Sequence, residues 1–302
     1  MNEQSCRVGD IELCYESLGD PEQPTVLLIM GLGLAMDWWC DDFCTALVAR
    51  GFHVVRFDNR DVGRSTHLAG RSISAWEFLT RRAHPDYTLG DMADDAAGLV
   101  AALDPCGAHV VGASLGGMIA QEVAIRHPAL TRSLVSIMAR PGDGRTGKVA
   151  WRMRAQFLRP PSADPVETMV RSLRRIGSVG RTERDDEDVR IAMYRSMRRS
   201  GGVDGRSAGA ARDDHGAGRQ LAACVAERNR TADLRRLPMP TLVLHGAADK
   251  VILPSGGRAT AAAIPNAELV EVSGMGHDLP RWVWPTLIDG ITRTTARTTS
   301  PT

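Results

Sequence analysis

The 302-residue sequence lacks a Cys-x-x-Cys pair and a series of histidines that could partner its cysteines. Its six cysteines are scattered along the chain and form no Cys-x-x-Cys motif; they are Cys6, Cys14, Cys40, Cys44, Cys106 and Cys224. Structural zinc sites and disulfide-stapled folds need grouped cysteines. We therefore expect reduced thiols, no metal site and a cytoplasmic location.

Long apolar runs and a large net charge are also missing. No stretch approaches the 18 apolar residues of a membrane span, and the polar start MNEQSCRVGD has no signal-peptide core. Lys and Arg number 37 against 36 Asp and Glu, and this net charge of +1 argues against a general nucleic-acid binder. We expect a soluble globular protein without a membrane or nucleic-acid partner, and leave its oligomeric state open.

The charge is nevertheless uneven along the chain. Residues 140–237 hold 22 Lys and Arg against 13 Asp and Glu, whereas the rest of the chain holds 15 against 23. A basic segment of this kind could steer an anionic substrate, but a solvated Arg-rich helical surface is the simpler interpretation.

Short apolar runs alternate with helical patterns over most of the chain. The runs are TVLLIM (25–30), HVVRFD (53–58), HVVGAS (109–114), SLVSIMA (133–139), TLVLHG (241–246) and AELVEV (267–272). Unbroken apolar runs separated by amphipathic segments such as 91–103 indicate parallel strands that helices bury on both faces. Ahead of them, Gly9-Asp10 is expected to close a hairpin with positive φ values. The predicted fold class is α/β, with a mostly parallel central sheet.

About a hundred residues without a clear strand interrupt this alternation. Within them, 167–176 and 187–197 have helical spacing. Because the segment is too long for an ordinary connection, we predict a helical cap insertion at 140–237, over the sheet edge. The core would then consist of 1–139 and 238–302, and the low-complexity end TRTTARTTSPT (292–302) is predicted to be a disordered tail.

A serine stands at the corner between one predicted strand and the helix after it. The pattern Gly112-x-Ser114-x-Gly116 follows a buried run and precedes a helical one. A sharp turn there strains the central residue and lifts its side chain clear of the sheet, while small glycines let neighbouring backbone pass close by. The helix that follows directs N–H groups and the positive end of its dipole at this corner. We interpret Ser114 as a nucleophile and not as a spacer.

A serine hydroxyl needs a base, and the base needs an acid to fix its tautomer. Asp249 follows the run that ends in His245-Gly246, and His277 lies in the glycine-rich turn after the last run. Taken alone, Asp249 could be a helix cap and His277 a surface histidine. The order Ser114, Asp249, His277 at successive strand ends instead indicates a catalytic triad.

Acyl transfer also requires hydrogen-bond donors for the oxyanion. We expect them to be the backbone N–H groups of Leu115, after the nucleophile, and of Leu32 in the loop Met30-Gly31-Leu32-Gly33-Leu34. As pocket residues we predict Gly31, Trp38 and Met118.

A competing motif is GDGRTGK (142–148), which matches a phosphate-binding loop. The next residue is Val149, where a magnesium-binding Ser or Thr is required, so nucleotide binding is disfavoured.

Together these motifs resemble those of the α/β-hydrolase superfamily along almost the whole chain. The shared segments are MGLGL, the turn DNRDVGRS (58–65), GASLGG, HGAAD and GMGHDLP. FDNRDVGRST and MGLGLAMDWW look closest to aclacinomycin methylesterase-like and actinobacterial esterase-lipase-like members. The resemblance implies a Ser114–His277–Asp249 triad beneath a cap. The chain departs from the family at Met30, where many members have His, and at Asp61, where many have Gly.

The sequence therefore predicts a serine esterase that cleaves a small-molecule carboxylic ester without any cofactor. A methyl ester of a bulky secondary metabolite is suggested only by the family resemblance. The same triad serves cofactor-free perhydrolases of the haloperoxidase type and C–C bond hydrolases, which stay open as alternatives. A non-enzymatic ligand receptor is disfavoured because all three triad residues are present.

Overall fold

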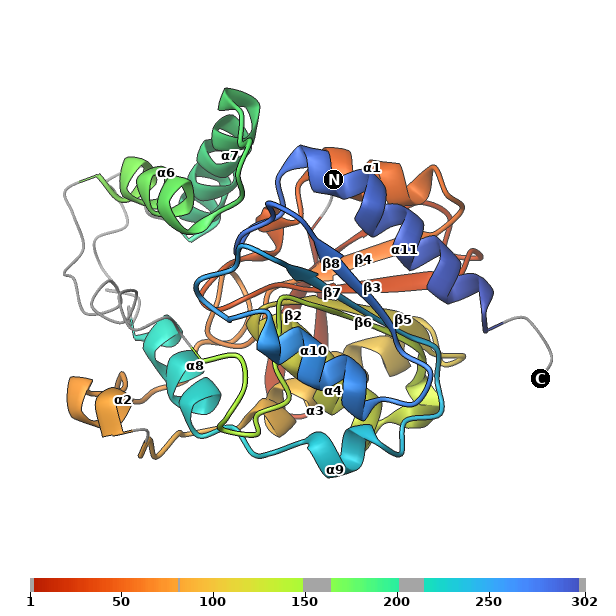
Figure 1. The fold of residues 1–302 in the computed structure, drawn as a ribbon, viewed down its shortest axis with the longest axis horizontal. Helices are drawn as coiled ribbons and strands as arrows, with labels where there is room; N and C mark the ends of the chain where they lie inside the picture. Colours follow the sequence, from red (N-terminus) through yellow and green to blue (C-terminus); the bar gives the residue numbers. More distant parts are fainter. Residues whose placement is uncertain (1–2, 81, 149–163, 201–214, 299–302) are drawn as a thin grey trace.

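The central element is an eight-stranded sheet, seen in the computed structural model of the chain (Figure 1). The structure describes residues 3–80, 82–148, 164–200 and 215–298. In chain order the strands are β1 (Gln4–Val8), β2 (Ile11–Leu18), β3 (Thr25–Ile29), β4 (His53–Phe57), β5 (Ala108–Ala113), β6 (Thr131–Ile137), β7 (Thr241–Gly246) and β8 (Glu268–Val272). They lie in the order β1-β2-β4-β3-β5-β6-β7-β8, and the pairs from β4 to β8 are parallel. The predicted α/β class with a mostly parallel sheet is confirmed.

The two antiparallel strands form the hairpin at one edge. β1 pairs with β2 and places Val8 opposite Ile11, so Gly9 and Asp10 make a two-residue turn. Gly9 has a φ of +57°, whereas Asp10 is not among the residues with positive φ. The hairpin lies where the sequence predicts it, but only its glycine adopts the left-handed conformation.

Helices cover both faces of the sheet. One face carries α1 (Asp41–Val48) and α11 (Trp284–Ala296), and the other carries α3 (Leu89–Leu103), α4 (Leu115–Arg126) and α10 (Ser255–Ala263) (Figure 1). Alternate residues of a strand point to opposite faces, so Leu27 of β3 joins one buried apolar cluster while Leu28 joins the other. Short helices lie in the connections: η1 (Met36–Trp38), α2 (Ala75–Thr80), η2 (Pro128–Leu130) and η4 (Arg281–Val283).

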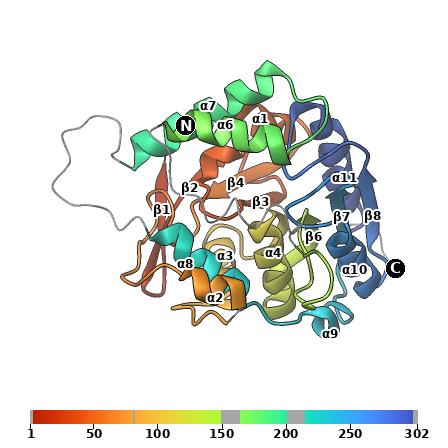
Figure 2. The same ribbon diagram turned by 60° about the vertical axis from the view of Figure 1, so that its left-hand side comes forward.

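The chain between β6 and β7 contributes four further helices within the described residues. They are α6 (Pro165–Ile176), α7 (Glu183–Arg199), α8 (Gly216–Val225) and α9 (Thr231–Leu234). Val170 and Leu173 of α6 pack on Val189 of α7, and this small cluster rests on Trp38 of the core. Figure 2 shows α6 and α7 side by side at one end of the sheet, with α8 close to α2.

The C-terminal segment differs from its prediction. α11 continues to Ala296, so residues 292–296 are helical and not a disordered tail. The physical reason is the apolar stripe of Leu287, Ile288 and Ile291, which packs the helix against the sheet and keeps Thr294 fully buried. Residues 299–302 lie outside the described part of the chain.

No helix in the described ranges combines the length and the apolar character that crossing a bilayer requires.

Candidate active site

Ser114 lies at the tight turn between β5 and α4. Its backbone has φ +58° and ψ −119°, a strained conformation for a residue with a side chain. A Cβ on Gly112 would lie 2.0 Å from the carbonyl oxygen of Gly116, and a Cβ on Gly116 would lie 2.1 Å from that of Ile29. Only glycine therefore fits at either position, and the packing around them holds Ser114 in its strained conformation.

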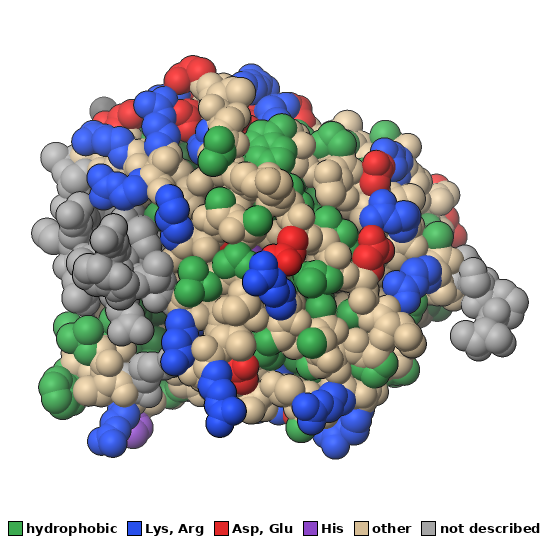
Figure 3. All heavy atoms as spheres, viewed as in Figure 1, with side chains coloured by type: hydrophobic (Ala, Val, Ile, Leu, Met, Phe, Trp, Pro, Cys, Tyr) green, Lys and Arg blue, Asp and Glu red, His purple; other side chains and the backbone are tan. Residues whose placement is uncertain are grey.

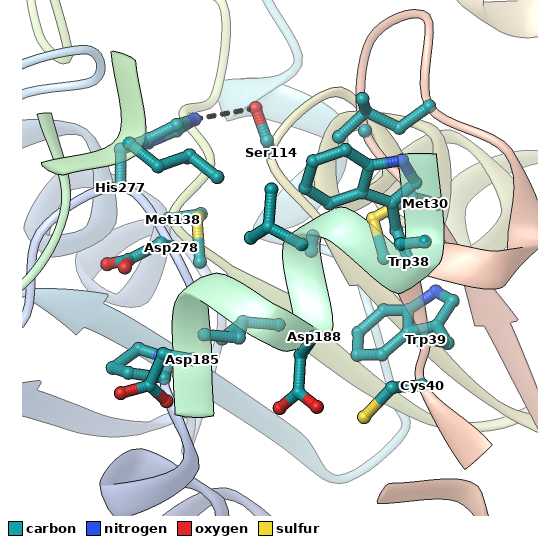
Figure 4. A pocket seen from close by; sticks show the side chains of 18 of the residues that line it. Met30, Trp38, Trp39, Cys40, Ser114, Met138, Asp185, Asp188, His277 and Asp278 are labelled. Atoms are coloured by element: carbon teal, nitrogen blue, oxygen red, sulfur yellow. Dashed lines mark hydrogen bonds between the residues drawn. The ribbon is translucent and has the colours of Figure 1, made fainter. Parts of the chain in front are cut away.

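The structure brings Ser114, His277 and Asp249 together. The Ser114 Oγ lies 2.9 Å from the His277 Nε2 (Figure 4). The His277 Nδ1 lies 2.7 Å from the Asp249 Oδ2. A carboxylate only accepts hydrogen bonds, so Nδ1 is the protonated nitrogen and Nε2 is free to accept from the serine hydroxyl. Asp249 follows β7 and His277 follows β8, which brings both to the carboxyl end of the sheet beside Ser114.

The carboxylate of Asp249 is held in its charged form. Burial on its own would raise the pKa of Asp249, but the neighbouring His277 and His245 outweigh it and lower the pKa to about 2. Oδ1 accepts hydrogen bonds from the backbone N–H groups of Val251 and Ile252, at 2.8 and 3.0 Å. Asp249 is therefore ionised at neutral pH and fixed in position to bind the protonated Nδ1 of His277.

The loop after β3 lies against the serine. A Cβ on Gly31 would be 3.3 Å from the Ser114 Cβ, so the loop passes the nucleophile at van der Waals distance. In the described part of the chain, the backbone N–H groups of Leu32 and Leu115 donate no hydrogen bond. The next N–H of the loop, that of Gly33, donates to the Gln220 side chain of α8 at 2.8 Å.

A cavity of about 330 Å³ extends from Ser114 and His277 between the core and the α6–α7 pair (Figure 4). Predicted pocket residues Gly31 and Trp38 line it, and so does Leu32. The other large apolar side chains of the wall are Met30, Leu34, Trp39, Phe43, Met138, Val251, Leu279 and Trp284 from the core and Met169, Leu173, Ile176 and Val189 from the insertion. The insertion therefore supplies one wall of the cavity beside the serine.

The third predicted pocket residue does not reach the cavity. Met118 is 1% exposed, belongs to the core cluster on the α3–α4 face, and contacts Cys224 from α8. Met118 lies in the first turn of α4 on the side that packs against the sheet and α3, so its side chain faces the core and not the cavity.

Part of the cavity wall is polar. Asp188 forms an ion pair with Arg281 at 2.6 Å, and Asp185 accepts the backbone N–H of Arg281 at 2.7 Å. Burial works to raise the pKa of Asp185, but hydrogen bonds from the backbone of Arg281 and from Thr182 leave it below the usual value. These carboxylates are already paired within the protein.

Cys40 is the thiol in the cavity wall. Burial is the main reason that the pKa of Cys40 rises to about 11. At neutral pH the thiol is therefore protonated and a poor nucleophile. All six cysteines are free in the structure.

The glycine-rich segment 142–148 is a bent loop without helix in the described residues. Asp143 folds back to accept hydrogen bonds from the backbone of Arg145 and Thr146 at 2.9 and 2.8 Å. The carboxylate thus occupies the backbone N–H groups that a phosphate-binding loop offers to its ligand.

Sequence reasoning missed three side chains of the insertion that touch the loops around Ser114 and His277. Gln220 binds the loop of Gly33, and Ser178 and Arg181 bind Asp278, next to His277. Their partners are between 97 and 187 residues away in sequence, so no local pattern signals these contacts.

The fold and the arrangement around Ser114 define a class of protein. A family model described as the alpha/beta hydrolase fold matches residues 24–280, and the chain belongs to this family. It is 28% identical over 290 residues to rhodomycin D methylesterase DnrP of Streptomyces peucetius, covering 90% of each chain. It is 29% identical over 276 residues to BpoC of Mycobacterium tuberculosis, provisionally named a non-heme bromoperoxidase, covering 88% of this chain and 91% of BpoC.

Solved structures agree with this assignment. A hydrolase from Pseudomonas aeruginosa PA01 superposes with a TM-score of 0.69 at 25% identity and 98% coverage of both chains. Esterase RhEst1 from Rhodococcus sp. ECU1013 gives a TM-score of 0.75 at 18% identity, covering 98% of this chain and 99% of RhEst1, and shows the shared fold. The resemblance inferred from the sequence motifs is confirmed: the chain is an α/β hydrolase with esterase relatives.

Proposed function

We propose that the chain is a serine hydrolase that cleaves a carboxylic ester through an acyl-enzyme intermediate. The observation that carries the proposal is the hydrogen-bonded chain from the Ser114 Oγ through His277 to Asp249 at an apolar cavity. Nucleophile and base lie 2.9 Å apart, and base and orienting acid lie 2.7 Å apart, which is the geometry that general-base activation of a serine requires.

In the proposed reaction, the His277 Nε2 takes the proton of Ser114 while the Oγ attacks the ester carbonyl. Asp249 holds the Nδ1–H and stabilises the imidazolium. The N–H groups of Leu32 and Leu115 bind the oxyanion, each contributing about 3 kcal/mol of transition-state stabilisation. His277 then protonates the leaving alcohol, and a water activated by the same imidazole releases the acid.

The cavity supports a bulky, largely apolar acyl group. Its volume of about 330 Å³ lies within the range of small-molecule sites, and its wall includes Trp38, Trp39 and Trp284. Rhodomycin D methylesterase is named for a methyl ester, so we propose a methyl ester of a bulky small molecule as substrate. The insertion at 140–237 acts as the cap.

A perhydrolase is the second candidate, because the chain is similar to BpoC. In that reaction hydrogen peroxide replaces water as the acceptor of the acyl group. Peroxide-dependent halogenation by the purified protein, at a rate exceeding ester hydrolysis, would favour this activity over esterase activity.

We predict that Ser114→Ala and His277→Ala each lower kcat on a nitrophenyl ester by about 10³-fold or more. Either change removes a reacting group without creating a large cavity, so the melting temperature should stay within a few degrees of wild type. Ser133→Ala is a matched control, because Ser133 forms a buried hydrogen bond to His109 at 2.8 Å but does not line the cavity. Wild-type turnover in Ser114→Ala would refute the mechanism.

A further inference from the structure

The loop that carries His277 packs directly on the insertion. The backbone N–H of His277 donates to the carbonyl of Ile176 at 3.1 Å, and the N–H of Val179 donates to that of Gly274 at 2.8 Å. A Cβ on Gly276 would lie 2.3 Å from the carbonyl carbon of Gly177. The two backbones are therefore in direct contact, and the end of α6 forms one side of the histidine loop.

Ser178 binds the residues on both sides of His277. Its Oγ donates to the Asp278 Oδ1 at 2.6 Å and accepts the backbone N–H of Gly276 at 2.9 Å. The backbone N–H of Ser178 donates to the same Oδ1 at 2.8 Å. One buried hydroxyl thus links the residue before the histidine to the residue after it.

Arg181 completes the contact on the other carboxylate oxygen. It donates to the Asp278 Oδ2 and, at 2.8 Å, to the Asp186 Oδ1 of α7. The side chains of Arg181, Asp278 and Asp186 are 8%, 5% and 3% exposed, so water does not replace these bonds. Hydrogen bonds between charged, buried groups have strong directional preferences and keep the loop in one arrangement.

We propose that Ser178 and Arg181, acting through Asp278, are positioning residues that hold the His277 imidazole in line with Ser114. The proposal rests on the proposed serine-hydrolase function and deepens it: the insertion covers the cavity and also sets the alignment of the base. A displacement of a catalytic group by about 1 Å lowers rates by about 10²-fold, so a loosened loop lowers kcat more than it raises KM.

The test uses Ser178→Ala, which changes no charge and lies outside the lining of the cavity. Two rates are measured: turnover of a nitrophenyl ester, and labelling of Ser114 by a fluorophosphonate, which needs an aligned base but no particular substrate. We expect about 10-fold lower kcat and labelling, a KM within twofold of wild type, and an unshifted acidic limb of the pH–rate profile.

Ser133→Ala and Glu227→Gln are matched controls. Ser133 is also a buried serine, and it binds His109. Glu227 is a carboxylate of the insertion that pairs with Arg140 at 2.6 Å and with Arg230 at 2.9 Å and does not line the cavity. Both should retain wild-type kcat and labelling. A fall in the controls equal to that in Ser178→Ala would overturn the proposal by showing a nonspecific effect.

The outcomes separate this proposal from the proposed function. If wild type neither hydrolyses esters nor reacts with the fluorophosphonate, the proposed function fails. If wild type reacts and Ser178→Ala reacts equally fast, or differs only in KM or in the position of the acidic limb, the positioning role is wrong while the function stands. Should Ser178→Ala not fold, Arg181→Lys, which keeps the charge and shortens the contact, takes its place with about a threefold loss expected. Because Arg181 lines the cavity, this variant is judged by kcat and labelling alone: equal values in Arg181→Lys and wild type would overturn the positioning role.

Discussion

Asp61 occupies a turn position at which glycine is the less strained residue, and contacts of its side chain offset this strain. It adopts a φ of +68°, a left-handed conformation that glycine occupies at little cost. Its buried carboxylate binds the Arg219 guanidinium of α8 at 2.8 and 2.9 Å and accepts the backbone N–H of Leu68 at 2.7 Å. Strain at this position is thus offset by an ion pair that glycine could not make.

Asp249 gives a prediction about pH and stability. Its pKa of about 2 in the folded protein lies below the ordinary value of 3.8, so its contribution to folding is fully present above about pH 4. As the pH falls from 4 to 2, the carboxylate is protonated and about 2 kcal/mol of stability is lost. The free energies of unfolding of wild type and Asp249→Asn, measured by urea titration at several pH values, should converge over this interval. A constant difference would contradict the assigned pKa.

Among the secondary-structure elements, helix α8 packs on the loop after β3 and stabilises it. Gln220 is fully buried, accepts the N–H of Gly33 at 2.8 Å and donates to the carbonyl of Arg60 at 2.8 Å. Gly33 has a φ of +67°, and a Cβ there would lie 2.9 Å from the Ala217 Cβ, so the loop and the helix fit closely. Since Leu32 precedes Gly33, the helix fixes the orientation of a proposed oxyanion donor.

We predict that Gln220→Ala lowers kcat by about 10-fold or more, because the loop around Leu32 loses its support and the N–H moves from its optimal direction. Ester kinetics check this, with Gln121→Ala as a control; Gln121 is also fully buried but binds Ser136 at 3.0 Å and not the loop. An unchanged kcat in Gln220→Ala together with reduced stability would show that the contact serves folding alone.

The sequence predicts elements well where the signal is local. Each apolar run became a strand within two residues at its start, because parallel strands buried on both faces need unbroken apolar side chains. The turn at Ser114 was also predictable, since the glycines on either side are required by close backbone contacts. Met118 was misplaced because periodicity gives the spacing along a helix but not which face meets a cavity. Gln220 and Ser178 could not be found, because their contacts depend on how the insertion folds onto the core.

In the whole molecule, ion pairs connect the basic insertion to the acidic core. The expectation of a solvated arginine surface holds only in part: basic side chains are spread over the face in Figure 3 without one large patch. Many arginines of the insertion instead pair with core carboxylates, as in Arg181–Asp278, Arg195–Asp41, Arg199–Asp58, Arg219–Asp61 and Arg228–Glu122. The opposite net charges of the two segments therefore meet at their interface.

Among the arginines that connect the insertion to the core, Arg199 pairs with two buried carboxylates. At the end of α7 it binds Asp58 at 2.6 Å and Asp37 at 2.7 Å, both nearly or fully buried. We predict that Arg199→Met lowers the free energy of unfolding by about 3–5 kcal/mol, because two carboxylates lose their buried partner. Arg195→Met, one turn earlier with a half-exposed pair, should cost less than about 1 kcal/mol. Equal losses in a denaturant titration would contradict this difference.

The close backbone contact between Gly276 and Gly177 limits how the insertion can be exchanged in engineered variants. Exchanging the insertion for that of another α/β hydrolase is one design for changing substrate specificity. Such a design treats the insertion as independent of the core. In this chain the replacement insertion would also have to reproduce the short segment from Ile176 to Arg181. A different backbone conformation in that segment would clash with the loop that carries Gly276 and His277. Chimeras should therefore keep residues 176–181 of this chain and exchange only the other parts of the insertion.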